Sequence, residues 1–260
     1  MKFVTQNLSC GYNRRSLMED VSVSFETGRA VCILGPNGVG KSTFFKTILG
    51  FLKPVSGSIF IDERDLQTIP RKELAKIIGY VPQIHGNPFP YSVRDIVLMG
   101  RASHLRLFAE PGRSDYRRCD EILEKLDILY LKDKLYSEIS GGEQQMTLIA
   151  RALVQEPEFI MMDEPTSNLD YGNQIQVLKR VVELKNSGKG VVMITHSPDQ
   201  AFLCADEAVL FFRDGSVVSG EVRDVLTEEN ISRLYGVEIE IDTGKNRDGA
   251  ASAWCRPVSV

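Results

Sequence analysis

The chain has 260 residues, of which 43% are hydrophobic and 25% charged, an ordinary globular balance. Its formal net charge of −4 at pH 7 argues against a protein that holds nucleic acid by bulk positive charge. Because we find neither an apolar stretch long enough to span a bilayer nor a secretory signal, we expect no transmembrane segment and no leader. The five cysteines form no Cys-x-x-Cys pair, which favours unpaired thiols over a disulfide framework.

Residues 35–43, GPNGVGKST, form the stretch around which we interpret the chain. They fit the phosphate-binding pattern G-x-x-x-x-G-K-[ST], and they lie between an apolar run typical of a strand and apolar residues at helical spacing. In such a loop, backbone N–H groups and the helix N-terminus face phosphate oxygens, the lysine adds a positive charge and the serine can ligate Mg²⁺. The sequence therefore predicts a nucleoside triphosphate site. The residues assigned to it are Gly35, Pro36, Asn37, Gly38, Val39, Gly40, Lys41, Ser42 and Thr43, with Ser42 also assigned to the metal.

The elements before residue 93 are predicted from alternation and turn residues. They are strands at 3–9, 21–25 and 57–61, a helix at 70–78, a strand at 79–82 and a loop at 84–92. We expect the first three strands to form a small antiparallel sheet beside the phosphate loop, with Tyr12 in a turn.

The later elements alternate between helical and strand patterns. They are helices at 92–100 and 114–129 joined by an irregular stretch, a helix at 141–155, a strand at 159–163, a helix at 171–185, a strand at 191–195, a helix that starts at Pro198, a hairpin that starts at 207–212, and helices at 222–227 and 228–235. The tail from Asp242 onward has little periodicity, and we expect it to be peripheral or frayed.

Asp163 and Glu164 end an apolar strand that we expect to lie beside the phosphate-loop strand in a parallel sheet. Ligands bind at the carboxyl edge of such sheets. Asp163 is then placed to hold Mg²⁺, and Glu164 to polarise a water for attack on the γ-phosphate. An acidic pair can also be a structural cap, but the phosphate loop upstream favours the catalytic interpretation.

The order of these motifs resembles the ATP-binding subunit of an ABC transporter along essentially the whole chain. The resemblance implies that Tyr12 stacks on adenine, that Gln83 contacts Mg²⁺ and the attacking water, and that His196 contacts the γ-phosphate. Residues 139–143, ISGGE, resemble the LSGGQ motif of the family, and Asn168 to Asp170 resemble its D-loop. The resemblance thus implies three groups of site residues: catalytic Glu164, His196 and Gln83; metal-binding Ser42, Gln83 and Asp163; and, beyond the loop and Tyr12, nucleotide-binding Ser140, Gly141, Gly142, Glu143 and Asp170.

Each motif outside the phosphate loop also has a structural interpretation. Tyr12 can pack in a turn, Gln83 can face solvent, the ISGGE stretch can simply cap a helix, and His196 can be a buried core histidine. The joint order of the motifs argues against all four.

The chain departs from the family at Ile139, Glu143 and Asn168, which replace Leu, Gln and Ala. Only the contacts of a neutral amide at position 143 are put in doubt. We therefore expect an active ATPase.

The resemblance implies an α/β fold with a RecA-like P-loop NTPase core, a small antiparallel β subdomain and a helical insert. The single ATP-binding domain would cover 1–242, with the core at 1–87 and 141–242, the helical subdomain at about 88–140 and a peripheral tail at 243–260.

The implied partners are a second copy of the chain, facing it head to tail, separate membrane permease subunits and, indirectly, a substrate-binding protein. No nucleic acid is expected. The chain would act at the cytoplasmic face of the membrane.

Residues 93–101 and 226–241 resemble the subgroup that imports metal chelates: iron–siderophore, haem, cobalamin or molybdate. A zinc or manganese importer, an exporter subunit and a soluble ABC ATPase remain alternatives, whereas a plain P-loop kinase or GTPase would lack the SGG turn. We expect the permease to dock on an apolar floor near the loop at 84–92. The candidates for this floor are Phe89, Tyr91, Ile96 and Val97.

Overall fold

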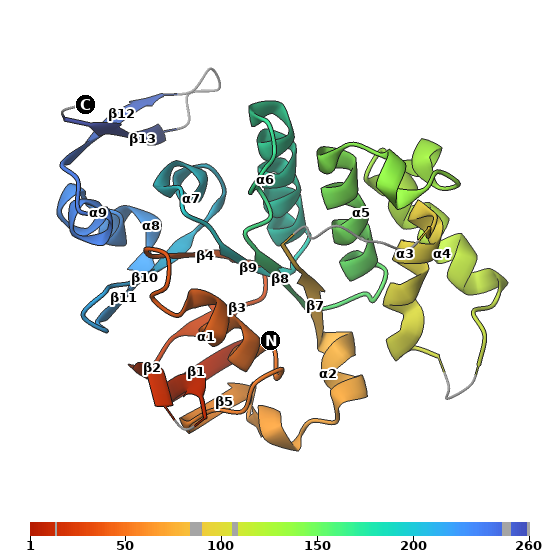
Figure 1. The fold of residues 1–260 in the computed structure, drawn as a ribbon, viewed down its shortest axis with the longest axis horizontal. Helices are drawn as coiled ribbons and strands as arrows, with labels where there is room; N and C mark the ends of the chain where they lie inside the picture. Colours follow the sequence, from red (N-terminus) through yellow and green to blue (C-terminus); the bar gives the residue numbers. More distant parts are fainter. Residues whose placement is uncertain (14, 84–89, 106–108, 246–250, 259–260) are drawn as a thin grey trace. The chain divides into compact units, whose positions relative to one another are not determined.

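The structure is a computed structural model that describes residues 1–13, 15–83, 90–105, 109–245 and 251–258. It divides into two compact units (Figure 1). The first unit consists of Met1–Thr68 and Leu178–Val260, and the second unit of Ile69–Val177. Helix α6 (Tyr171–Asn186) contains the later boundary between them. The predicted loop at 84–92 lies largely outside the described residues.

An antiparallel sheet in the first unit has the strand order β2–β1–β5–β6, and β3 also pairs with β1. The strands are β1 (Lys2–Tyr12), β2 (Arg15–Val21), β3 (Ser24–Glu26), β5 (Ser56–Ile61) and β6 (Arg64–Asp65), followed by a short 3-10 helix at Leu66–Thr68. The predicted antiparallel sheet is confirmed. The single strand predicted at 21–25 is wrong, because the Val23 N–H donates to the Thr5 hydroxyl oxygen instead of continuing a strand ladder.

The central strand of the first unit is β4 (Ala30–Leu34), in which every residue is buried. The strand order around it is β11–β10–β4–β9, and β4 runs parallel to both of its neighbours. The other strands are β9 (Gly190–Ile194), β10 (Glu207–Phe211) and β11 (Val217–Glu221). Because β9 and β10 occupy both edges of β4, the expectation that the strand at 159–163 lies directly beside it is wrong. A continuous apolar run predicts a buried strand but does not specify its neighbours.

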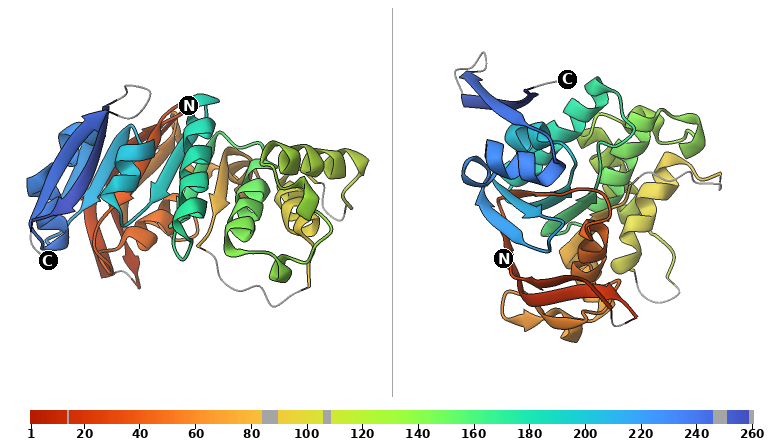
Figure 2. Two further views of the ribbon diagram at one scale, coloured as in Figure 1. Left: turned by 90° about the horizontal axis from the view of Figure 1, so that it is seen from above. Right: turned by 60° about the vertical axis from the view of Figure 1, so that its left-hand side comes forward.

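Besides the part of α6 from Leu178 onward, the described residues of the first unit form the helices α1 (Lys41–Ile48), α7 (Pro198–Cys204), α8 (Val222–Val225) and α9 (Glu228–Tyr235). After α9 the chain forms a hairpin of β12 (Ile239–Lys245) and β13 (Ala251–Pro257), so the alternative of a frayed tail is wrong for the residues of these strands. Figures 1 and 2 show this hairpin beside α9. It is anchored because the Cys255 N–H donates to Asp199 of α7 and the Ile241 N–H to Glu228 of α9. These hydrogen bonds to distant segments stabilise the hairpin, which is why the weak periodicity of its sequence did not predict it.

The second unit combines helices with two parallel strands, β7 (Ile78–Val81) and β8 (Phe159–Asp163). Its helices are α2 (Arg71–Ile77), α3 (Val93–Leu98), α4 (Arg113–Lys125) and α5 (Gly141–Leu153), with 3-10 helices at Met99–Ser103, Leu129–Leu131 and Tyr136–Glu138. The predicted cap of α3 is confirmed, since the Ser92 hydroxyl accepts from Asp95 N–H. Helix α4 ends four residues earlier than predicted, and Asp127 just beyond it has a positive φ of 61°.

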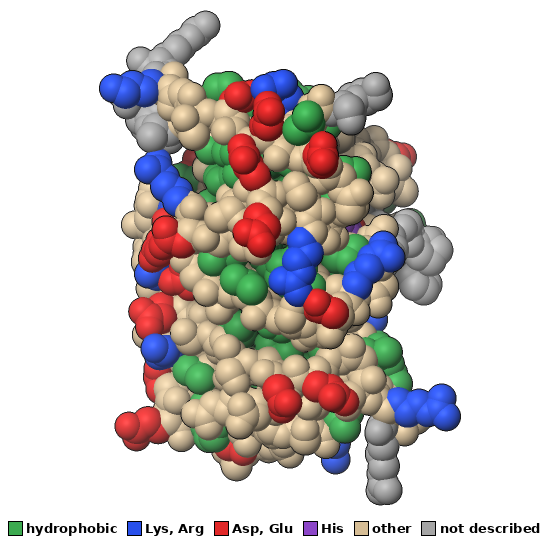
Figure 3. Space-filling model, turned by 90° about the vertical axis from the view of Figure 1, so that its left-hand side faces the viewer, with side chains coloured by type: hydrophobic (Ala, Val, Ile, Leu, Met, Phe, Trp, Pro, Cys, Tyr) green, Lys and Arg blue, Asp and Glu red, His purple; other side chains and the backbone are tan. Residues whose placement is uncertain are grey.

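Charged side chains are mixed on the one face that Figure 3 draws, where Lys and Arg lie scattered among Asp and Glu. This mixing agrees with the modest net charge of −4. Among the residues that the structure describes, no helix has the length and apolar character needed to cross a membrane.

A largely buried ion pair joins two helical segments of the second unit. Arg101 Nε lies 2.9 Å from Asp115 Oδ1, and Arg101 also donates to the Val154 carbonyl oxygen. Asp115 additionally accepts from the Gly112 N–H at 3.0 Å. The Gly112 N–H and the Arg101 guanidinium together lower the pKa of Asp115 from its ordinary value of 3.8.

We predict that Asp115→Asn lowers the free energy of unfolding at pH 7 by about 3 kcal/mol, because Arg101 loses its counter-charge. The folded pKa of Asp115 is lowered, so its stabilisation is complete above the ordinary value of 3.8 and is lost as the pH falls through the folded value. The deficit should therefore shrink below about pH 3.8. Urea unfolding at several pH values measures it, with the exposed Asp133→Asn as the control. A deficit that is the same at every pH would contradict the prediction.

Candidate functional site

The phosphate loop of the first unit connects β4 to α1, as predicted. Its Gly38 and Gly40 have φ values of 82° and 109°, in the left-handed region that favours glycine. A Cβ atom at Gly40 would lie 2.7 Å from the Met18 Cγ, so Met18 of β2 packs directly against the loop. No acidic residue occupies the first turn of α1, which leaves its N-terminus suited to an anion.

The Lys41 ammonium is buried against the loop, with 4% of the residue exposed. Its Nζ donates to the Gly35 carbonyl oxygen at 2.6 Å and to the Pro36 carbonyl oxygen at 3.0 Å. These two carbonyl oxygens fix the position of the ammonium beside the loop. The loop therefore presents a fixed positive charge close to its own backbone N–H groups, an arrangement that favours phosphate.

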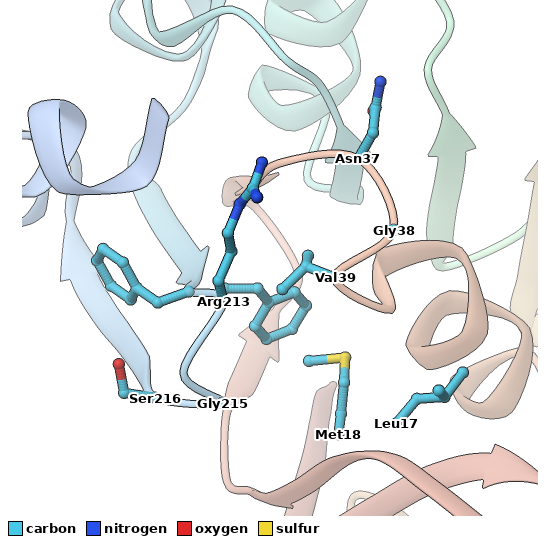
Figure 4. Close-up of a pocket in the computed structure, with 10 residues that line it drawn as sticks. Leu17, Met18, Asn37, Gly38, Val39, Arg213, Gly215 and Ser216 are labelled. Carbon is cyan, nitrogen blue, oxygen red and sulfur yellow. The ribbon is translucent and has the colours of Figure 1, made fainter. Parts of the chain in front are cut away.

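A pocket of about 300 Å³ opens along the outer flank of this loop (Figure 4). Its walls come from β2, from the loop and from the turn between β10 and β11. The lining residues are Leu17, Met18, Asn37, Gly38, Val39, Phe211, Phe212, Arg213, Gly215 and Ser216. Phe211 also packs edge-on against Phe44 of α1, with ring centroids 5.2 Å apart, which fixes this wall to the helix that follows the loop.

Tyr12 and His196 are both exposed in the first unit. Tyr12 is the last residue of β1 and is 46% exposed, so its ring is accessible for stacking. His196 follows β9, and its exposure excludes the alternative of a buried core histidine. Its backbone carbonyl oxygen accepts from the Tyr235 hydroxyl at 2.9 Å, which ties the segment after β9 to α9.

The predicted carboxylates lie at the end of β8 in the second unit. Asp163 is buried, with 9% exposed. Burial and, to a smaller extent, the Asp163 charge raise the pKa of Tyr80 to about 12, which keeps that phenol neutral. Glu164 has a positive φ of 47° and begins a turn closed by the Ser167 N–H, which donates to the Glu164 carbonyl oxygen at 3.1 Å.

Gln83 lies against this turn. Its Nε2 is 3.3 Å from Glu164 Oε2 and 3.3 Å from Ser167 Oγ. The structure thus brings together two residues that the sequence predicted, Gln83 and Glu164. Sequence reasoning missed Ser167, which is separated from Gln83 by 84 residues, and no local pattern signals their contact.

The ISGGE stretch forms the N-terminus of α5, with Ser140 as the cap. The Ser140 N–H and hydroxyl both donate to Glu143 Oε2 at 2.8 Å, while the Tyr130 hydroxyl donates to Glu143 Oε1 at 2.9 Å. The Ser140 N–H and then its hydroxyl lower the pKa of Glu143, so the carboxylate stays ionised. Glu143 therefore stabilises the turn through its own bonds to Ser140. Tyr130, which sequence reasoning missed, holds the other oxygen of the Glu143 carboxylate.

Gly142 and Asp170 meet through a residue that sequence reasoning also missed. Asp170 Oδ1 accepts from the Asn173 N–H and Oδ2 from the Asn173 Nδ2, each at 2.8 Å. A Cβ atom at Gly142 would lie only 2.2 Å from the Asn173 Oδ1. A larger residue at 142 would therefore displace the Asn173 side chain from Asp170, and the predicted SGG turn and D-loop aspartate lie together. The usable signal is Asp170 itself, because Asp directly before a predicted helix start is a preferred N-cap residue whose carboxylate accepts from a backbone N–H in the first turn.

Three of the four proposed permease-docking residues can now be placed. Ile96 and Val97 of α3 are 4% and 0% exposed, so they belong to the core and cannot form a docking floor, which corrects that expectation. Helical spacing identified their face as apolar but not which partner covers it. Tyr91 is 39% exposed, and Phe89 lies outside the described residues.

Comparisons with known proteins agree with this geometry. The sequence model of the ABC transporter family matches residues 18–167. The chain belongs to the ABC transporter family, as an ATP-binding subunit. The molybdate import ATP-binding protein MolC of Haemophilus influenzae is 37% identical, over 88% of this chain and 86% of its own. The hemin import ATP-binding protein HmuV of Bordetella avium is 34% identical, over 93% of this chain and 94% of its own.

A solved structure of an ABC transporter has the same fold as this ABC subunit. An ABC transporter described as of the metal-chelate type, in an inward-facing conformation, superposes with a TM-score of 0.88 and 32% identity. The match covers 99% of this chain and 97% of that chain. The subunit therefore has the P-loop NTPase fold and is an ATPase, as the sequence predicted.

We predict that Lys41→Ala weakens ATP binding by at least about tenfold, because the phosphates lose a charge-assisted hydrogen bond in a buried setting. Isothermal titration calorimetry measures the dissociation constant. The control is Lys46→Ala, which removes the same charge from an exposed position of α1. Equal ATP affinity in the two variants would refute the role of Lys41.

Proposed function

We propose that this ABC ATPase subunit energises the import of a metal chelate, such as an iron–siderophore complex, haem, cobalamin or molybdate. The main support is its likeness, along 99% of its length, to the transporter of metal-chelate type. The relatives named for hemin and molybdate import point to the same class of solute.

The nucleotide would be held by the phosphate loop, with Tyr12 stacked on the base. Mg²⁺ would be held by the Ser42 hydroxyl, the Gln83 side-chain oxygen and the Asp163 carboxylate. This donor set fits, because Mg²⁺ prefers oxygen ligands and Asp163 ends a buried strand. The ion would neutralise charge on the β- and γ-phosphates.

Glu164 would act as the general base of hydrolysis. In this proposal its carboxylate accepts a proton from the attacking water, and the tight turn that starts at Glu164 fixes the position from which it acts. Gln83, hydrogen-bonded to the same carboxylate, would orient the water, and the exposed His196 would donate to the γ-phosphate.

Two copies would be needed for a complete site. The α5 N-terminus offers backbone N–H groups at Gly141 and Gly142 and a cap at Ser140 that is ordered by Glu143. In a head-to-tail dimer, this turn of one copy would contact the γ-phosphate held by the phosphate loop of the other. Asp170 would line the same interface. ATP would then hold the dimer closed, and hydrolysis would release it.

The dimer would act at the cytoplasmic face of a membrane, bound to permease subunits that receive solute from a binding protein. We place a permease contact at the exposed Tyr91, directly before the capped start of α3. Nucleotide-driven movement of the second unit would reach the permease through this segment.

Purification of the complete complex and its reconstitution in liposomes tests the import assignment. We expect solute-loaded binding protein to stimulate ATP hydrolysis and uptake when the solute is a ferric siderophore, haem, cobalamin or molybdate. Stimulation by Zn²⁺ or Mn²⁺ alone, or movement of solute outward, would overturn it.

We predict that Glu164→Gln binds ATP but hydrolyses it at least about a hundredfold more slowly, because general base catalysis is lost. The ATP-bound dimer of this variant should then accumulate, and gel filtration detects it. The control is Glu158→Gln, which makes the same change at the exposed residue directly before β8, outside the proposed site. Near-normal turnover in Glu164→Gln would exclude the assigned role.

A further inference from the structure

Three polar groups meet at the turn after β8. Gln83 Nε2 lies 3.3 Å from both Glu164 Oε2 and Ser167 Oγ. The Ser167 hydroxyl itself donates to the Glu164 carbonyl oxygen at 2.8 Å. Its single proton is thereby used, so Ser167 faces Gln83 as an acceptor.

This arrangement fixes which end of the Gln83 amide faces the turn. An amide carries one NH₂ and one oxygen, and its orientation is set by its hydrogen-bond partners. Here the Glu164 carboxylate oxygen and the Ser167 hydroxyl oxygen are both acceptors, so only the NH₂ satisfies them. The Gln83 Oε1 must then point away from both of these groups.

We propose that Ser167 is a positioning residue that, together with Glu164, holds the Gln83 amide so that Oε1 is presented as a ligand for Mg²⁺. This inference rests on the proposed function, in which Gln83 is a metal ligand. It adds a residue that neither the motifs nor the comparisons assign.

The turn is well suited to hold this orientation. Glu164 and Asn168 have positive φ values of 47° and 60°, and the Ser167 N–H is bonded to the Glu164 carbonyl oxygen at 3.1 Å. Both acceptors therefore sit on one short, hydrogen-bonded segment. Without the Ser167 hydroxyl, the NH₂ keeps one acceptor, and the flipped amide, which presents nitrogen to the metal, becomes accessible.

The test measures how binding of a non-hydrolysable ATP analogue depends on free Mg²⁺, by fluorescence titration. We expect Ser167→Ala to raise the Mg²⁺ midpoint about three- to tenfold, the effect of losing one hydrogen bond. Ser167→Thr retains the hydroxyl and should restore a midpoint close to that of the wild type. In ATPase assays, Ser167→Ala should raise the Mg²⁺ requirement more than it lowers kcat.

A double-mutant cycle with Gln83→Ala shows whether Ser167 acts through Gln83. In the Gln83→Ala background, Ser167→Ala should leave the midpoint unchanged. A wild-type midpoint in Ser167→Ala, or an equal rise in both backgrounds, would overturn the positioning role while leaving the proposed function intact. Failure of the wild-type chain to bind the analogue in a Mg²⁺-dependent manner would instead refute the proposed function.

Discussion

The first unit is built around a buried lysine ammonium that a loop of fixed shape must hold. The Lys41 ammonium is held by the carbonyl oxygens of Gly35 and Pro36, and it can stay there only if the loop keeps its shape. That shape depends on β4, which parallel neighbours fix on both edges, and on Gly40, whose φ of 109° favours glycine and which packs against Met18. The central sheet and the antiparallel sheet thus both serve to hold one positive charge beside a helix N-terminus.

The second unit depends on the turn from Glu164 to Asn168. This turn uses two non-glycine residues with positive φ, a strained arrangement of the kind that clusters at functional sites. Its hydrogen bonds hold the Glu164 carboxylate and the Gln83 amide against each other. The SGG turn is ordered separately. Glu143 accepts from the Ser140 N–H, and Asn173, which is bonded to Asp170, packs against Gly142. In our proposal these two preorganised surfaces contact nucleotide in different copies of the chain.

The sequence predicted features that depend on local order along the chain. The phosphate loop, the cap at Ser92 and most helices follow from residues a few positions apart, and the structure confirms them. Strand order, the C-terminal hairpin and the burial of Ile96 arise from contacts between distant segments, which periodicity does not encode. Ser167 and Asn173 escaped for the same reason, because their importance lies in the side chains they touch. The resemblance to a family supplied roles for Gln83 and His196 that residue patterns alone did not.

The central claim is that each ATP is bound between the phosphate loop of one copy and the SGG turn of the other. Mixing two defective subunits, Lys41→Ala and Ser140→Arg, each in a Glu164→Gln background, tests it most directly. One of the two sites in the mixed pair then has an intact loop facing an intact turn. Analytical ultracentrifugation with ATP should show a dimer in the mixture and monomers of each variant alone. A mixture that remains monomeric, or a single variant that dimerises as well as the mixture, would contradict the account.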